Sequence, residues 1–131
     1  MPPDLQSEGT APKASGMLAE RYRALHALLD RSLEMLQQAK KEHWAEVIQT
    51  GAQRQRLIEA FFEQPVAPAE TDEVALVLRK MLQANEEIEA LAVNSRGGVS
   101  ASIGSIQQGR RAVLAYAENT GPNHRIAPSG Q

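Results

Sequence analysis

The stretch LAERYRALHALLDRSLEMLQQA, from Leu18 to Ala39, decides the fold class of this chain. Its apolar residues recur at alternating spacings of four and three, which is the period of an amphipathic α-helix. The stripe consists of Leu18, Tyr22, Leu25, Leu29, Ser32, Leu36 and Ala39, and Leu28, Leu33 and Met35 widen it. A stripe of this width indicates a helix that packs against more than one neighbour.

A second stripe follows with a different phase. Continuing the first stripe would bury Glu46 and Gln53, so the stripe shifts at Trp44, which fits either a tight helix–helix turn or a continuous helix that changes partner. Pro65 and Pro68 end this helix, because proline has no N–H to donate and clashes inside a helix. The apolar stripe of the second helix comprises Trp44, Val47, Ile48, Gly51, Ile58, Phe61 and Phe62.

Two further stripes complete the pattern. Gly97 and Gly98 end the third helix, as glycines just past a helix often do. The fourth helix is weak, because Gly104, Gly109 and three serines lower its helix propensity by about 3 kcal/mol. Its order must therefore come from docking on the other helices. The third stripe is Val74, Val77, Leu78, Met81, Leu82, Asn85, Ile88, Leu91 and Ala92, and the fourth is Val99, Ile103, Ile106, Val113, Leu114 and Tyr116.

These patterns predict an all-α fold, an antiparallel bundle of three to four helices. We expect the helices at residues 17–41, 44–63, 71–96 and 99–118. They form one domain over residues 17–118. The flanking segments, residues 1–16 and 119–131, are rich in proline and glycine and poor in apolar residues, so we expect both to be disordered tails.

The composition speaks against catalysis. The chain has no cysteine, which excludes disulfides, thiolate metal sites and cysteine nucleophiles. His26, His43 and His124 are scattered, and none has the Glu-x-x-His spacing of a di-iron bundle. We therefore expect no enzyme activity, no cofactor and no metal.

The charge is unevenly placed. Residues 70–92 carry six acidic residues against two basic ones, a net charge of −4, and residues 93–131 carry four arginines against one glutamate, a net charge of +3. Either these are ordinary solvated faces, or the basic last segment docks loosely against the acidic one before it. The overall charge of −2 argues against direct nucleic-acid binding. No apolar run approaches the roughly 18 residues of a membrane span, and no signal peptide is visible, so we expect a cytoplasmic protein.

Two stretches together resemble a known family. LLDRSLEMLQQAKKEHWAEVIQTGAQRQRLIEAFF, residues 28–62, and GRRAVLAY, residues 109–116, are similar to the FliT family of flagellar type III export chaperones. The marks are Trp44 shortly after a helix ends, Arg54 and Leu57–Ile58 on the next helix, and the closing Gly-Arg-Arg to Tyr pattern. The likeness spans about residues 17–118.

The resemblance implies a function. Such chaperones bind the C-terminal segment of the filament cap protein in the cytoplasm, stop it from self-associating and deliver it to the export ATPase complex. Some members also restrain the master transcription activator of flagellar genes. Alternatives are a FlgN-like chaperone for hook–filament junction proteins and a non-catalytic regulatory bundle.

In the family the last helix can cover the binding surface and must move for partners to engage. We expect the client surface on the exposed part of the second and third helices, at Ile48, Phe61, Phe62, Val74, Leu78, Met81 and Leu82. The alternative for each of these residues is the bundle core. We expect the covering residues at Ile103, Ile106, Val113 and Tyr116, with Arg110 and Arg111 contacting the acidic third helix or an acidic partner.

Overall fold

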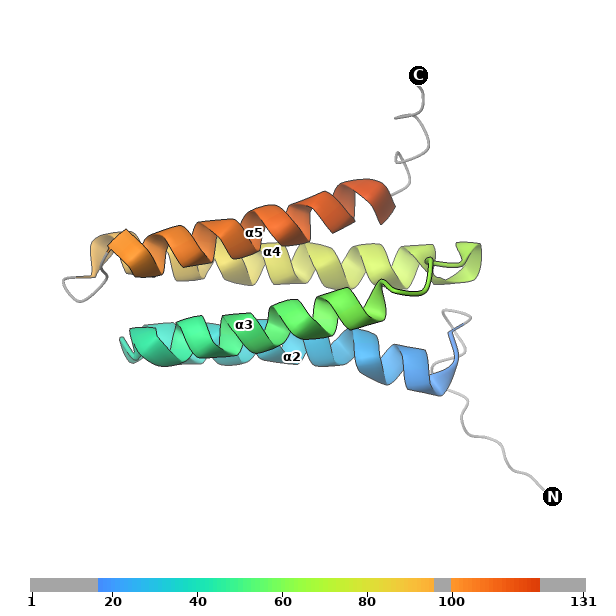
Figure 1. Ribbon diagram of the computed structural model, residues 1–131, viewed down its shortest axis with the longest axis horizontal. Helices are drawn as coiled ribbons and strands as arrows, with labels where there is room; N and C mark the ends of the chain where they lie inside the picture. Colours follow the sequence, from blue (N-terminus) through green and yellow to red (C-terminus); the bar gives the residue numbers. More distant parts are fainter. Residues whose placement is uncertain (1–16, 96–99, 121–131) are drawn as a thin grey trace.

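The computed structural model describes residues 17–95 and 100–120, and within them the chain forms four long α-helices (Figure 1). The predicted all-α class is confirmed. The helices are α2 (Ala19–Lys40), α3 (Trp44–Phe61), α4 (Thr71–Asn94) and α5 (Ser100–Thr120), with a short 3-10 turn, η2 (Pro68–Glu70), before α4. Each helix begins and ends within two residues of its predicted bounds. Residues 119 and 120, predicted as tail, continue α5, and the rest of both predicted tails and the Gly97–Gly98 stop lie outside the described residues.

The four helices run antiparallel in chain order and form two hairpins, α2 with α3 and α4 with α5 (Figure 1). Helix α2 packs against α3 and α4, and α5 packs against α4. Helices α3 and α5 contact each other far less than these pairs do. The α3–α5 side is therefore the least closed side of the bundle.

Buried apolar side chains fill the bundle in two clusters. The first contains Met17, Leu25, Leu28, Ile58, Phe61, Val74, Val77, Leu78, Met81 and Val113. The second contains Met35, Leu36, Ala39, Trp44, Val47, Ile88, Ala92 and Ile106. On α2, α3 and α4 a buried polar residue lies in sequence between the two clusters, namely Ser32, Arg54 and Asn85.

The turn between α2 and α3 explains the change of phase without a glycine or proline. Glu42 adopts the left-handed conformation, with φ of 61°. The backbone N–H of Glu42 donates to the Ala39 carbonyl and that of His43 to the Gln38 carbonyl, each at 2.9 Å. The turn is fixed to the end of α4, because Trp44 Nε1 donates to Ser95 Oγ at 3.2 Å.

Two leucines of the first stripe do not reach the core. Leu18 precedes α2 and is 75% exposed, and Leu33 is 46% exposed on the outer face of that helix. The predicted stripe was too wide at these two positions. The other stripe residues of α2 are buried or half-buried.

Candidate partner-binding cleft

A buried arginine stands at the centre of the bundle. Arg54 of α3 is 2% exposed, and its Nη1 donates to Ser32 Oγ on α2 at 2.9 Å. Its Nη2 donates to Asn85 Oδ1 on α4, also at 2.9 Å. Asn85 Nδ2 in turn donates to the Ile106 carbonyl on α5 at 3.2 Å. One chain of hydrogen bonds thus joins all four helices.

This arginine has only neutral partners. Within residues 17–95 and 100–120, no carboxylate forms an ion pair with Arg54. Burial lowers the pKa of its guanidinium from the usual value to about 10, so it stays charged at neutral pH. A buried cation is strongly favoured by a nearby anion, because the protein interior solvates charge less well than water does. The centre of the bundle therefore holds a positive charge that no carboxylate of the described residues balances, and a negative group placed beside it would be stabilised.

The two glycines inside α5, which we expected to act alike, differ in their surroundings. A Cβ on Gly109 would lie 2.8 Å from Arg54 Nη2, closer than side chains normally approach. A Cβ on Gly104 would meet nothing within 4 Å. Gly109 thus lets the guanidinium lie against α5, whereas Gly104 lowers helix propensity with no packing reason.

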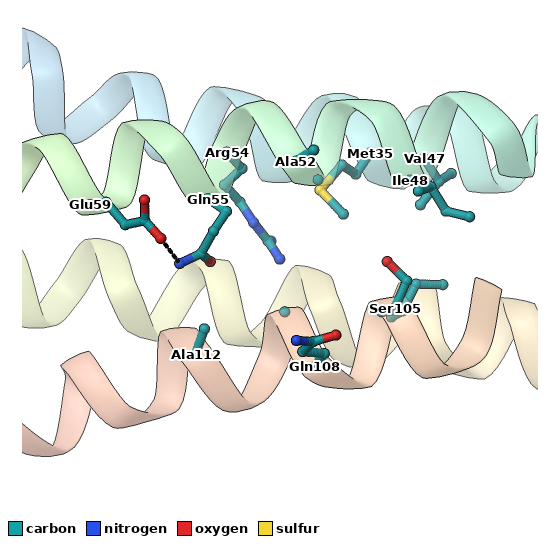
Figure 2. A pocket seen from close by; sticks show the side chains of 13 residues that line it. Met35, Val47, Ile48, Ala52, Arg54, Gln55, Glu59, Ser105, Gln108 and Ala112 are labelled. Carbon is teal, nitrogen blue, oxygen red and sulfur yellow. Dashed lines mark hydrogen bonds between the residues drawn. The ribbon is translucent and has the colours of Figure 1, made fainter. Parts of the chain in front are cut away.

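A cleft of about 370 Å³ opens between α3 and α5 over this arginine (Figure 2). In Figure 2 the Arg54 side chain extends from α3 toward the space between these two helices. Gln55 Nε2 donates to Glu59 Oε2 at 3.1 Å along one end of the cleft. The α3 wall includes Ile48, Ala52 and Gln55, and the α5 wall includes Ser105, Gln108 and Ala112.

On its other side α5 is attached to α4 by polar contacts. Gln107 Nε2 donates to Glu89 Oε2 at 2.8 Å. Arg110 Nε lies 3.2 Å from Glu89 Oε1, an ion pair in which the N–H does not point at the oxygen. These contacts agree with the interpretation that the basic last segment docks on the acidic one. Arg111, expected to share this role, is exposed and has no ion pair among the described residues.

Aromatic contacts join α3 to α5 at the end of the bundle where α3 ends. The Phe62 ring, just after α3, stacks on Tyr116 of α5 at a centroid distance of 4.4 Å. Phe61 packs edge-on against Phe62 at 5.0 Å. The guanidinium of Arg21 lies 4.0 Å from the centroid of the Phe61 ring. This stacking is the main aromatic link between the α3 end and α5 in the described part of the chain.

The structure separates the predicted client residues. Ile48 is 37% exposed and lines the cleft, and Phe62 and Leu82 are half-buried against the first apolar cluster. The expectation of exposure is wrong for Phe61, Val74, Leu78 and Met81, which are buried in the first cluster. The reason is that α2 and α5 both contribute to that cluster and close over the stripe.

The predicted covering residues divide between the two clusters. Val113 is buried in the first cluster, with Tyr116 half-buried against it. Ile106 is buried in the second, with Ile103 half-buried against it. Helix α5 thus contacts both clusters along most of its length.

The apolar stripe of α3 did not predict the role of Arg54, because such a stripe includes apolar positions only. The α3 stripe skips the six residues between Gly51 and Ile58, and Arg54 occupies the position in that gap that faces inward. Ser32 and Asn85 stand on the inward stripes of α2 and α4. Three polar residues on three buried stripes are a signal for one shared buried network.

These features define a small helical-bundle binding protein with an open side. The family model described as Flagellar protein FliT matches residues 22–119, most of the chain, and the chain belongs to this family. Membership makes it a flagellar export chaperone and decides between the FliT-like and FlgN-like alternatives in favour of the first. No match was found among curated proteins or among solved structures.

Membrane spans and metal-binding clusters are both absent from residues 17–95 and 100–120. None of the helices there has the length and hydropathy of a membrane span. No group of three or more histidine, aspartate or glutamate side chains in those segments is placed to hold a metal ion.

Proposed function

We propose that this chaperone binds the C-terminal segment of the filament cap protein in the cytoplasm, prevents its premature self-association and delivers it to the export ATPase complex. Family membership over residues 22–119 is the observation that supports this most strongly. The flagellar master transcription activator is a second partner on the same basis. In both roles the protein acts by binding, through surfaces that its last helix controls.

The client surface in this proposal lies on α3 and α4 and at the end of α3. Its residues are Ile48, Phe61, Phe62, Val74, Leu78, Met81 and Leu82. Most of them are buried while α5 is in place. The client reaches them when α5 moves away from α3. Such movement costs α5 little free energy, because α5 contacts α3 far less than it contacts α4.

Binding to matched segments tests the proposal. Full-length protein is titrated calorimetrically with the C-terminal segment of the cap protein from the same organism, and in parallel with an equally long C-terminal segment of a hook–filament junction protein. We expect binding to the first only. Equal binding to both, or binding to the junction segment alone, contradicts the proposal.

The covering role of α5 has its own test in Tyr116. Tyr116 of α5 stacks on Phe62 at the end of α3, and this contact is lost when α5 separates from α3. Tyr116→Leu therefore destabilises the closed state selectively, and we expect the affinity for the cap segment to rise by about fivefold. Gly104→Ala is the control, because it raises helix propensity in the closed and the open state alike and should leave the affinity unchanged. If Tyr116→Leu also leaves the affinity unchanged, α5 is not a cover.

A further inference from the structure

We propose that the α3–α5 cleft is where the client first docks, and that it takes an amphipathic client helix that places an aspartate or glutamate on Arg54. This inference rests on the function proposed above, because the occupant is the client of this chaperone. It adds the chemistry of recognition, which family membership does not specify. The charge of Arg54, the shape of the cleft and the other charges near it each support a part of it.

Arg54 has more N–H donors than its partners in the bundle use. A guanidinium has five N–H groups, and the described structure gives two of them partners, the neutral oxygens of Ser32 and Asn85. A carboxylate can accept two parallel N–H bonds from one guanidinium, and it removes the uncompensated charge at the same time. The arginine also borders the cleft, so the carboxylate can arrive from that side. Charge complementarity thus selects an acidic residue on the occupant.

The size of the α3–α5 cleft limits what can occupy it. An α-helix with side chains is about 10 Å across, so a cleft of about 370 Å³ takes a few side chains from one face of a helix and not the whole helix. The cleft lies between two helices, which is the geometry in which a third helix lays its ridge into a groove. Ile48, Ala52 and Ala112 make much of its wall apolar. The occupant is therefore a helix with an apolar face and one acidic residue within that face.

One negative side chain of the protein also faces the cleft. Glu59 lies five residues after Arg54 on α3, about 7.5 Å along the helix axis, and bonds only to Gln55 among the described residues. It disfavours an acidic client residue at its own end of the cleft. The client carboxylate should therefore approach Arg54 from the end near Ile48. This like charge sharpens the specificity of the site.

A double-mutant cycle tests the ion pair. Each aspartate and glutamate of the cap segment is changed singly to asparagine or glutamine, and each variant is titrated into the wild-type chaperone and into Arg54→Met, with circular dichroism to verify the fold. We expect one client position to lose affinity by about tenfold or more against the wild type and to lose almost nothing against Arg54→Met. If no client position behaves in this way, the inference is overturned.

A second variant tests the cleft without touching the buried network. Ala52→Trp fills the cleft from an exposed position, and Ala60→Trp adds the same side chain at an exposed alanine of α3 outside it. Ala52→Trp should lower the affinity by about tenfold, whereas Ala60→Trp should leave it unchanged. Equal effects of the two substitutions overturn the inference. If the wild-type protein does not bind the cap segment at all, the proposed function itself fails; if it binds and the cleft variants have no effect, only this inference fails.

Discussion

The two sides of α5 are built differently. Toward α4, its backbone accepts a hydrogen bond from Asn85, and Gln107 and Arg110 both reach Glu89. Toward α3, it lines an open cleft, Gly109 lies against the Arg54 guanidinium, and Tyr116 stacks on Phe62. The same helix is thus held by several polar contacts on one side and by far fewer contacts on the other, among them the stacking of Tyr116 on Phe62.

This difference shows how a bundle can be stable and still open. A helix held by directed bonds to one neighbour keeps its register when it separates from a second neighbour. When the bundle opens, α5 loses only its few contacts with α3, and the hydrogen bond from Asn85 to the Ile106 carbonyl keeps α5 on α4. An opening of this kind exposes the inner face of α3 and α4 without unfolding the last helix.

The largest loss of stability is expected at Asn85, the residue through which the buried network holds α5 on α4. Asn85→Leu keeps a similar volume but removes the partners of an Arg54 N–H and of the Ile106 carbonyl. A buried guanidinium that loses a partner is costly, so we expect a loss of about 3 kcal/mol in the free energy of unfolding. Urea denaturation measures it. Asn94→Leu, at an exposed position of the same helix, should change it by less than about 0.5 kcal/mol. A loss below 1 kcal/mol for Asn85→Leu would mean that the network does not fasten α5.

The next effect distinguishes the two glycines of α5. Gly109→Ala places a methyl group against the held guanidinium and should cost about 1 kcal/mol after its gain in helix propensity. Gly104→Ala, with open space around it, should instead add up to about 1 kcal/mol. Thermal unfolding of the two variants provides the comparison. In an Arg54→Met background the cost of Gly109→Ala should disappear, because the overlap is with that side chain. Equal stabilisation by both alanines would contradict the close approach of Arg54 to α5.

The smallest effect on stability is expected from the ion pair between Arg21 of α2 and Glu70, two residues that do not line the α3–α5 cleft. Arg21 donates from Nε and Nη2 to the two carboxylate oxygens of Glu70, at 3.1 and 2.9 Å, and these bonds lower the pKa of Glu70. Because the pKa is lower in the folded than in the unfolded state, the pair stabilises the fold above the unfolded value of about 4.3. That contribution is lost as the pH falls through the folded value.

Melting temperatures between neutral pH and pH 3 test this linkage. The wild type should lose stability on acidification more steeply than Glu70→Gln, by at most about 1 kcal/mol. Glu63→Gln, an exposed glutamate at the end of α3, is the control and should follow the wild type. Identical acid profiles for the wild type and Glu70→Gln would show that this corner does not depend on the ion pair.

Much of the fold could be predicted from the sequence, because helix period is a local property. The stripes of α2 and α4 and the prolines after α3 placed the helix bounds, since burial repeats with the helical turn. Which two helices would remain apart could not be predicted, because a stripe shows that a face is buried but not by which neighbour. For this reason Phe61 and Leu78 were expected to be exposed and are instead buried in the core.

The candidate site was harder to predict, since it depends on one polar residue. Ser32 and Asn85 were visible on their stripes, but a hydrogen-bond network needs the relative position of three helices. In the sequence Gly109 shows only a low helix propensity, and its packing role follows from its distance to Arg54 in the fold. A single buried arginine adds nothing to an apolar pattern, so the cleft that it borders could not be predicted without the positions of α3 and α5.

The central claim is that α5 stays on α4 while it separates from α3, and pulsed electron resonance distances test it most directly. The chain has no cysteine, so spin labels can be introduced at exposed positions only, as Arg56→Cys on α3, Lys80→Cys on α4 and Arg111→Cys on α5. On addition of the cap segment, the distance between labels at 56 and 111 should lengthen, and the distance between labels at 80 and 111 should not change. Lengthening of both distances, or of neither, would contradict the account.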